Sequence, residues 1–148
     1  MHNVYMFQPQ YAVEIRKEDT YWLPYSVGCL WSYCSQFKDI TDNFELKEFI
    51  FRREDPQDIL DRLDNPAVCV FSCYIWNERY NLHVAQLIKE KYPECIIEFG
   101  GPQATEKLAE YDFIDCIIIS EGEQSFLDLL RKVMMREPYE RIYRKERI

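Results

Sequence analysis

Apolar positions along the chain fall into short continuous runs that alternate with stretches of helical spacing. Residues 67–75, AVCVFSCYI, form an apolar and partly β-branched run, which is typical of a parallel strand covered on both faces. Residues 77–92 carry apolar side chains three or four positions apart, so a helix is expected there, with Asn77 as its cap.

The same patterns assign the rest of the chain to alternating strands and helices. Strands are expected at 3–9, 44–51, 67–75, 94–99 and 115–120, and helices at 23–37, 55–64, 77–92, 105–111 and 123–135. Five such units predict an α/β fold, a flavodoxin-like (Rossmann-like) doubly wound five-stranded parallel sheet with helices on both faces. We expect this domain to span 1–135, followed by a charged tail or linker at 136–148.

Composition and charge narrow the classes of partner. The chain has 148 residues, of which 47% are hydrophobic, so one compact domain with a real core is expected. A net charge of -8 argues against a nucleic-acid partner, because such partners are bound through positive charge. No apolar run approaches the roughly 18 residues of a membrane span and no signal peptide is evident, so we expect no membrane partner and a cytoplasmic location.

The six cysteines favour a reduced protein rather than a disulfide framework or a metal site. Cys69, Cys95 and Cys116 lie inside apolar runs, where a free thiol behaves as a small hydrophobic group. If Cys69 and Cys73 began a three-cysteine cluster motif, the third position would be Trp76. We therefore expect no metal or iron–sulfur site made by this chain alone.

Ligands of a doubly wound sheet bind at the carboxyl ends of its strands, so the residues in the loops at that edge indicate which kinds of ligand site are present. The loop after the first strand has no glycine-rich phosphate motif, which argues against a dinucleotide or flavin site. A two-component receiver needs acidic residues where this chain has Gln8, Pro9 and Ser72. The sequence therefore argues against both a dinucleotide or flavin site and a two-component receiver.

Small and polar residues follow the third, fourth and fifth strands, in SCYIWN (72–77), GGPQAT (100–105) and SEGEQSF (120–126). Turn and capping chemistry explains each loop alone, with Thr105 as a cap for the helix that follows. Three such loops on one edge favour a ligand crevice. Glu121 and Glu123 flank Gly122, but carboxylates before a helix are better explained by its dipole than by acid–base catalysis.

The segments VFSCYIWNERYNLHVAQLIKEKYPECIIEFGGPQAT and FIDCIIISEGEQSFLDLL resemble the N-terminal cobalamin (vitamin B12)-binding domain of cobalamin-dependent radical S-adenosylmethionine (radical SAM) proteins. The resemblance implies a flavodoxin-like fold that holds cobalamin across the carboxyl edge of the sheet, with the nucleotide tail among the strands. It implies no catalytic or metal-ligating residue in this chain. The cofactor-binding residues it implies are Ser72, Cys73, Tyr74, Trp76, Gly100, Gly101, Pro102, Gln103, Glu121, Gly122 and Glu123.

Two departures from the family pattern shape the functional hypotheses. No D-x-H-x-x-G motif follows the first strand, so cobalamin would bind without a protein histidine on cobalt. The radical domain with its three-cysteine motif is missing, so S-adenosylmethionine and an iron–sulfur cluster would come only from another domain or partner. The leading hypothesis is a cobalamin-binding module of a radical SAM enzyme. The alternative is a degenerate interaction module without cofactor, and an independent small-molecule enzyme is the weakest reading.

Overall fold

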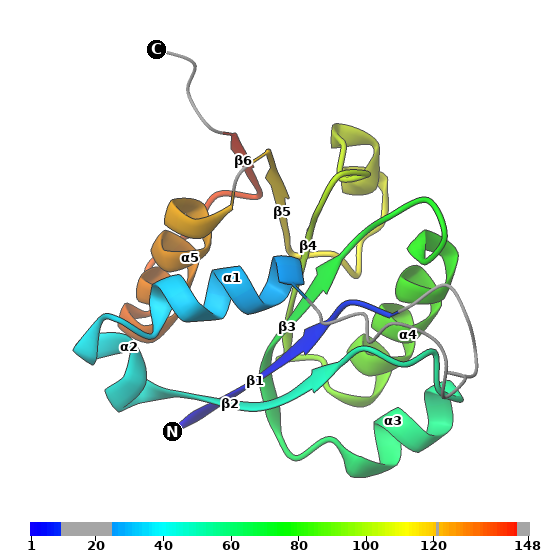
Figure 1. Ribbon diagram of the computed structural model, residues 1–148, viewed down its shortest axis with the longest axis horizontal. Helices are drawn as coiled ribbons and strands as arrows, with labels where there is room; N and C mark the ends of the chain where they lie inside the picture. The colour runs from blue at the N-terminus through cyan, green and yellow to red at the C-terminus, as the bar shows by residue number, and fades with distance from the viewer. Residues whose placement is uncertain (10–24, 121, 145–148) are drawn as a thin grey trace.

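Six parallel strands form one sheet in the computed structural model of the chain, which describes residues 1–9, 25–120 and 122–144. The strand order is β2-β1-β3-β4-β5-β6, so the direction of winding reverses between β1 and β3 (Figure 1). The predicted flavodoxin-like parallel α/β sheet is confirmed. The strands are β1 (His2–Phe7), β2 (Phe44–Ile50), β3 (Pro66–Ser72), β4 (Ile96–Gly100), β5 (Cys116–Ile119) and β6 (Ile142–Arg144).

The prediction of five strands is wrong by one, because β6 comes from the segment expected to be a charged tail or linker. β6 pairs in parallel with β5, with Ile117 opposite Ile142 and Ile119 opposite Arg144. It is three residues long and ends in a charged side chain, as protected edge strands often do, so it leaves no apolar run in the sequence. The domain boundary after residue 135 stays a prediction.

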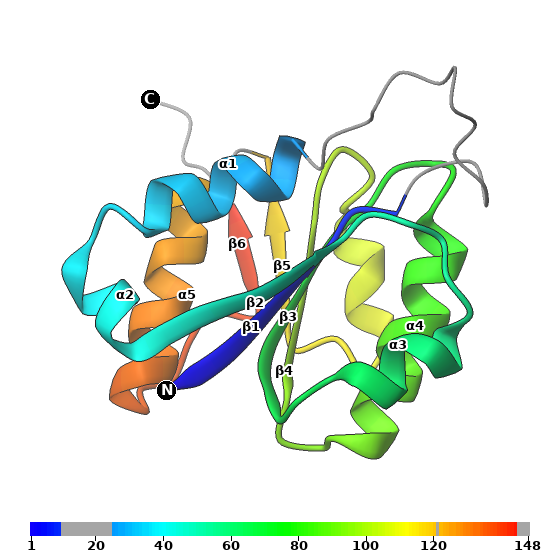
Figure 2. The same ribbon diagram turned by 60° about the horizontal axis from the view of Figure 1, so that its bottom comes forward.

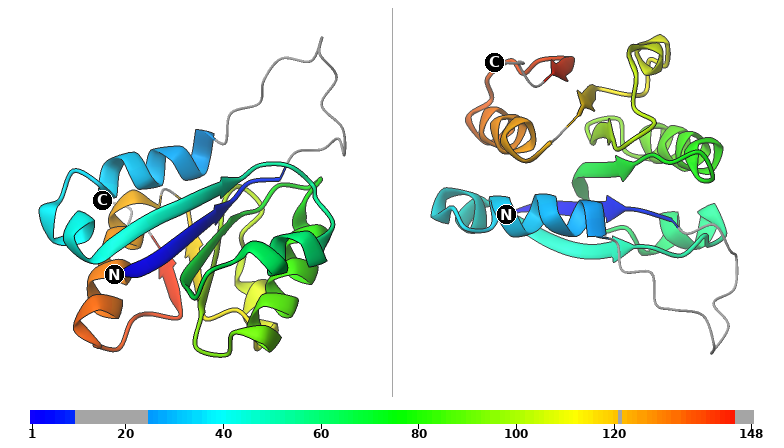
Figure 3. Two further views of the ribbon diagram at one scale, coloured as in Figure 1. Left: turned by 90° about the horizontal axis from the view of Figure 1, so that it is seen from below. Right: turned by 45° about the horizontal axis from the view of Figure 1, so that its top comes forward.

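Helices cover both faces of the sheet, as expected (Figures 2 and 3). A short helix at 38–43 was not predicted, and the expected start of the first helix, including Pro24, lies outside the described residues. On one face lie α1 (Tyr25–Cys34), α2 (Lys38–Asn43) and α5 (Glu123–Met135), and on the other lie α3 (Pro56–Arg62), α4 (Glu78–Lys91) and the 3-10 helix η1 (Glu106–Glu110).

Each face of the sheet has its own hydrophobic cluster, because successive side chains of a strand point to opposite faces. On the α3/α4 face, Phe71 stacks between Phe7 and Phe99 of the neighbouring strands, with ring centroids 4.3 and 4.9 Å away. The expectation of free, buried cysteines in the apolar runs is confirmed: Cys69, Cys95 and Cys116 are free and buried.

The side chain of Asp55 caps the helix that follows it, whereas the side chain of Thr105 does not. The Asp55 side chain accepts a hydrogen bond of 2.9 Å from the Gln57 backbone N–H and so caps the amino end of α3. Thr105 precedes η1 but its side chain makes no capping hydrogen bond, so its predicted role as a cap is wrong. No helix within the described ranges is long and apolar enough to cross a bilayer.

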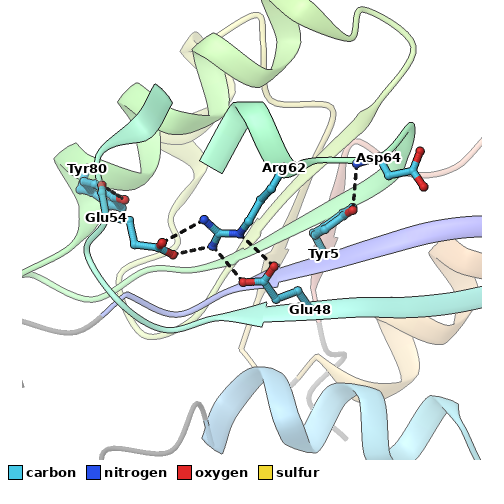
Figure 4. A network of polar contacts seen from close by, with 6 residues as sticks. All are labelled: Tyr5, Glu48, Glu54, Arg62, Asp64 and Tyr80. Carbon is cyan, nitrogen blue, oxygen red and sulfur yellow. Dashed lines mark hydrogen bonds and ion pairs between the residues drawn. The ribbon is translucent and has the colours of Figure 1, made fainter. Parts of the chain in front are cut away.

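A polar network fastens the β2 edge of the sheet to α3 and α4 (Figure 4). The Arg62 guanidinium donates to both carboxylate oxygens of Glu48, at 3.0 and 2.9 Å, and also binds the Glu54 carboxylate. The Tyr80 hydroxyl donates to the backbone carbonyl of Glu54, and burial is the main cause that raises the Tyr80 pKa to about 12. This network lies on the α3 side of the sheet and connects β2 to α3 and α4.

Candidate ligand cavity at the carboxyl edge of the sheet

A cavity of about 510 Å³ opens where β3, β4 and β5 end, on the α1/α5 face of the sheet. Helix α1 forms one wall, the three strands form the floor and the amino end of α5 forms the opposite wall. Its volume lies within the range of small-molecule pockets. The residues that line it are Ser26, Val27, Cys29, Leu30, Val70, Phe71, Ser72, Glu98, Gly100, Gly101, Pro102, Ala104, Ile118, Ile119, Ser120, Gly122 and Glu123.

The structure brings together residues from all three loops that the sequence singled out. Their function as ligand contacts stays a prediction, but their common position at one cavity follows from the parallel order β3-β4-β5. Of the expected site residues, Ser72, Gly100, Gly101, Pro102, Gly122 and Glu123 line the cavity. Glu121 lies outside the described residues.

Cys73 and Gln103 do not line the cavity. Cys73 belongs to the hydrophobic cluster on the opposite face, where its sulfur accepts a 3.5 Å hydrogen bond from Asn81 Nδ2. Burial raises the pKa of the Cys73 thiol to about 12, so it is protonated at neutral pH. The Gln103 backbone N–H donates to the Cys73 carbonyl, so Gln103 joins the loop after β4 to the loop after β3 and does not line the cavity.

Tyr74 and Trp76 lie outside the cavity and form a stacked pair, with ring centroids 4.7 Å apart and planes 13° apart. The Tyr74 hydroxyl is 2.5 Å from Ser26 Oγ, and Ser26 lines the cavity, so the stack stands beside its mouth. Trp76 is 43% exposed and the neighbouring Ile75 is 79% exposed. Together these three side chains, called the aromatic platform below, present apolar surface to solvent.

Asn77 holds the loop beneath this platform. Its Oδ1 accepts a 2.8 Å hydrogen bond from the Tyr74 backbone N–H, and its Nδ2 donates to the carbonyls of Ser72 and Pro9. Asn77 directly precedes α4, as predicted, but its side chain makes no capping hydrogen bond, so the predicted role as a cap is wrong. The fully buried amide instead ties the end of β3 to the segment after β1.

Close contacts inside the protein leave little room for side chains at the glycine pair at the end of β4, Gly100 and Gly101. Gly101 has φ of +94°, and a Cβ there would lie 2.7 Å from the backbone nitrogen of Cys73 and 2.8 Å from its carbonyl oxygen. The Cys73 N–H donates to the Gly100 carbonyl at 2.8 Å, so the β3 and β4 loops are bound together at this point. A Cβ on Gly100 would lie 3.0 Å from Glu98 Oε1, so this glycine leaves room for a carboxyl group.

Glu98, on the cavity floor, is the residue that the sequence interpretation missed. It is 1% exposed, and its Oε2 has no hydrogen-bond partner among the described residues. Burial raises its pKa well above the ordinary value. Ser72 Oγ, on the neighbouring strand, is buried and without a described partner in the same way. A carboxylate in the middle of the apolar run IIEFG was the signal that could have identified it.

The cavity carries no described positive side chain. The titratable residues that line it are Cys29, Glu98 and Glu123, and its remaining walls are largely apolar. Both histidines lie elsewhere: His2 begins β1, and His83 is exposed on α4. No three His, Cys, Asp or Glu side chains within the described residues group to hold a metal ion. The cavity therefore suits an uncharged group with a few polar atoms.

Comparisons with known proteins agree with the predicted family. No family model matches the chain. The cobalamin-dependent radical SAM methyltransferase TokK of Streptomyces tokunonensis is 31% identical over 78% of this chain. The 2-(S-pantetheinyl)-carbapenam-3-carboxylate methyltransferase of Streptantibioticus cattleyicolor is 29% identical over the same share. The chain spans only 18% of the length of each of these two relatives.

Among solved structures, the RcsB response regulator of Salmonella typhimurium has a similar fold, with a TM-score of 0.63 over 94% of this chain and 62% of that one. At 13% identity this likeness concerns the fold alone. Sequence similarity over most of the chain is instead to two methyltransferases, of which TokK is a cobalamin-dependent radical SAM enzyme, and the predicted resemblance to cobalamin-dependent radical SAM proteins is confirmed.

Proposed function

We propose that this chain is the cobalamin-binding module of a radical SAM enzyme and that its cavity receives part of the cofactor. The observation that carries the proposal is the cavity at the carboxyl ends of β3, β4 and β5, whose floor holds two buried polar side chains without described partners, Ser72 and Glu98. Orphaned polar atoms at a cavity are typical of sites completed by a ligand. One of the relatives named above, TokK, is cobalamin-dependent.

The shape of the site suits a cofactor with a broad ring and a slimmer tail. Cobalamin is larger than a cavity of about 510 Å³, so only the base end of its nucleotide tail would enter. The corrin would lie across the mouth, against the aromatic platform and the exposed Pro102. Gly122 keeps the α5 wall open, because a Cβ there would come within 3.3 Å of both Ile118 and Leu30.

The residues of this chain bind and orient the cofactor and exclude water from its tail, while the reacting groups come from elsewhere. Bound cobalamin supplies a cobalt-carried methyl group or assists a radical rearrangement. No protein imidazole is proposed for cobalt, since neither histidine lines the cavity. S-adenosylmethionine and an iron–sulfur cluster would be bound by another domain or chain, which also sets the substrate.

One observation favours the alternative of an interaction module without cofactor. Ile75 and Trp76 expose apolar surface, as residues at protein interfaces do. A module that had lost its cofactor would, however, be expected to fill the crevice with side chains. The open cavity beside the platform favours the cofactor-binding module.

The proposal is tested by loading the purified chain with methylcobalamin in the dark, desalting it and recording the visible spectrum. We expect corrin absorbance to elute with the protein in a ratio close to one cofactor per chain. A colourless protein fraction would refute cofactor binding and leave the interaction module as the better reading.

A further inference from the structure

The floor of the cavity holds one acidic side chain, Glu98, and none of the described residues that line the cavity is a cation. On β4, Ile97 and Phe99 face the α3/α4 cluster, so Glu98 faces the opposite side, toward α1 and α5. In register, Glu98 pairs with Val70 on β3 and with Cys116 on β5. The carboxyl is almost fully buried and one of its oxygens has no described partner.

The surroundings of Glu98 determine its protonation state. Cys29 of α1 and Glu123 of α5 are the other titratable groups that line the cavity, and Cys116 is its neighbour on β5. None of these three groups is a cation, so nothing on the described walls stabilises a carboxylate. Desolvation therefore raises the pKa of Glu98 and favours the protonated, neutral form of the side chain. A neutral carboxyl group has one O–H donor in addition to its acceptors.

We propose that Glu98 is a hydrogen-bond donor that selects a flat, uncharged group with an acceptor nitrogen inside the cavity and that disfavours a phosphate there. This inference rests on the proposed function. In cobalamin the group with this chemistry is the benzimidazole base at the end of the nucleotide tail. The apolar side chains of Val27, Leu30 and Ile118 would contact its ring, and Ser72 Oγ supplies a second polar contact.

The charge distribution supports this choice of ligand group. A phosphate buried beside a carboxyl, with no lysine or arginine on the described walls, would lose its hydration without compensation. The amino end of α5 also borders the cavity, but Glu123 already occupies its first turn and offsets the dipole. A neutral heteroaromatic base loses little hydration on entering the cavity, and its acceptor nitrogen can accept a hydrogen bond from the protonated Glu98 carboxyl group.

The inference predicts that Glu98 contributes to the binding of the nucleotide base. The probes are methylcobalamin and methylcobinamide, which share the corrin and methyl group, whereas methylcobinamide lacks the whole nucleotide (phosphate, ribose and base). Wild type should bind methylcobalamin with a shift of the visible band to shorter wavelength, which marks the detached base. It should bind methylcobinamide without such a shift.

Variants of Glu98 separate its role as a donor from a role in packing. Glu98→Leu should lose about tenfold in methylcobalamin affinity, as expected for one lost hydrogen bond, and should leave methylcobinamide affinity unchanged. Glu98→Gln should retain affinity within about threefold, because its amide N–H still donates. Thermal melting checks that each variant folds, and Glu98→Leu is expected to melt no lower than wild type, since it removes an unpaired polar group.

A pH series gives an independent readout. Because the folded pKa of Glu98 lies above its ordinary value of about 4.5, the folded chain holds this proton more tightly than the unfolded chain does. Its effect on stability is therefore most favourable below about pH 4.5 and worsens as pH rises toward the folded pKa. Between pH 5.5 and 8.5, the melting temperature of wild type should fall relative to that of Glu98→Gln.

The outcomes separate the two proposals. If neither probe binds, the proposed function is refuted, and this inference with it. If both probes bind wild type equally, with no spectral shift and no effect of Glu98→Leu, the cofactor-binding function stands and the role of Glu98 is refuted. A loss of affinity in Glu98→Leu that Glu98→Gln avoids supports the inference.

Discussion

Replacing Gly101 by alanine is expected to destabilise the folded chain by about 2–6 kcal/mol, the sum of left-handed backbone strain and overpacking. Gly101 has φ of +94°, and an added Cβ would lie 2.7 Å from the backbone nitrogen of Cys73. The two nearest atoms it meets are backbone atoms of Cys73, which cannot rotate away as a side chain can. Because small domains are stable by only about 5–15 kcal/mol, the loss is a large share of the total.

Gly28 provides a matched control for this substitution. It lies within α1, and a Cβ there would meet no atom within 4 Å. Gly28→Ala should stabilise the chain by up to about 1 kcal/mol through helix propensity. Urea unfolding followed by circular dichroism compares the two variants. Equal midpoints for them would show that the loops after β3 and β4 do not depend on Gly101.

The variant Cys29→Trp is expected to abolish methylcobalamin retention, with a loss of affinity of about a hundredfold or more, as for a group that fills a ligand's place. Cys29 lines the cavity from α1, so a large ring there occupies space proposed for the nucleotide tail. The measurement is a spectroscopic titration with methylcobalamin, with a melting curve to confirm folding.

Ser32→Trp adds the same side chain on the same helix but outside the cavity. Ser32 is exposed and does not line the cavity, so this variant should bind methylcobalamin as wild type does. Unimpaired binding by a folded Cys29→Trp variant would place the cofactor elsewhere on the molecule. Equal loss in both variants would point to a general effect of tryptophan on α1 instead.

Features that repeat along the chain were predictable from the sequence. The inner strands are buried on both faces and therefore appear as apolar runs, as 67–75 does, and this pattern was sufficient for the parallel sheet. The carboxyl-edge rule then brought the loops beginning at Ser72, Gly100 and Ser120 to one place. Strand β6 was not predictable in this way, because it is short and ends in a charged residue. It forms by pairing with the β5 edge, which exists only in the folded sheet.

The candidate site was predictable in its position but not in its chemistry. The sequence shows which residues follow each strand but not which way the backbone turns, so Cys73 was assigned to the cavity although it faces the opposite cluster. The contribution of α1 depends on how that helix packs against the sheet, which periodicity does not give. Glu98 was not predicted, because the sequence does not show that its face of the sheet is open at that point.

Cys29 offers the most direct test that cobalamin enters this cavity. Of the six cysteines it is the one that is not buried, and burial is the main cause that raises the pKa of Cys34 and Cys73 to about 12. Iodoacetamide should therefore label Cys29 selectively in the folded chain, and mass spectrometry can map the adduct. In urea all six thiols should react, whether or not the cofactor is present.

The measurement is the rate of Cys29 labelling with and without saturating methylcobalamin. The account predicts at least about a tenfold slower reaction when the cofactor is bound, because its tail would cover the thiol. An unchanged labelling rate, in a sample whose spectrum shows bound cobalamin, would contradict binding in this cavity.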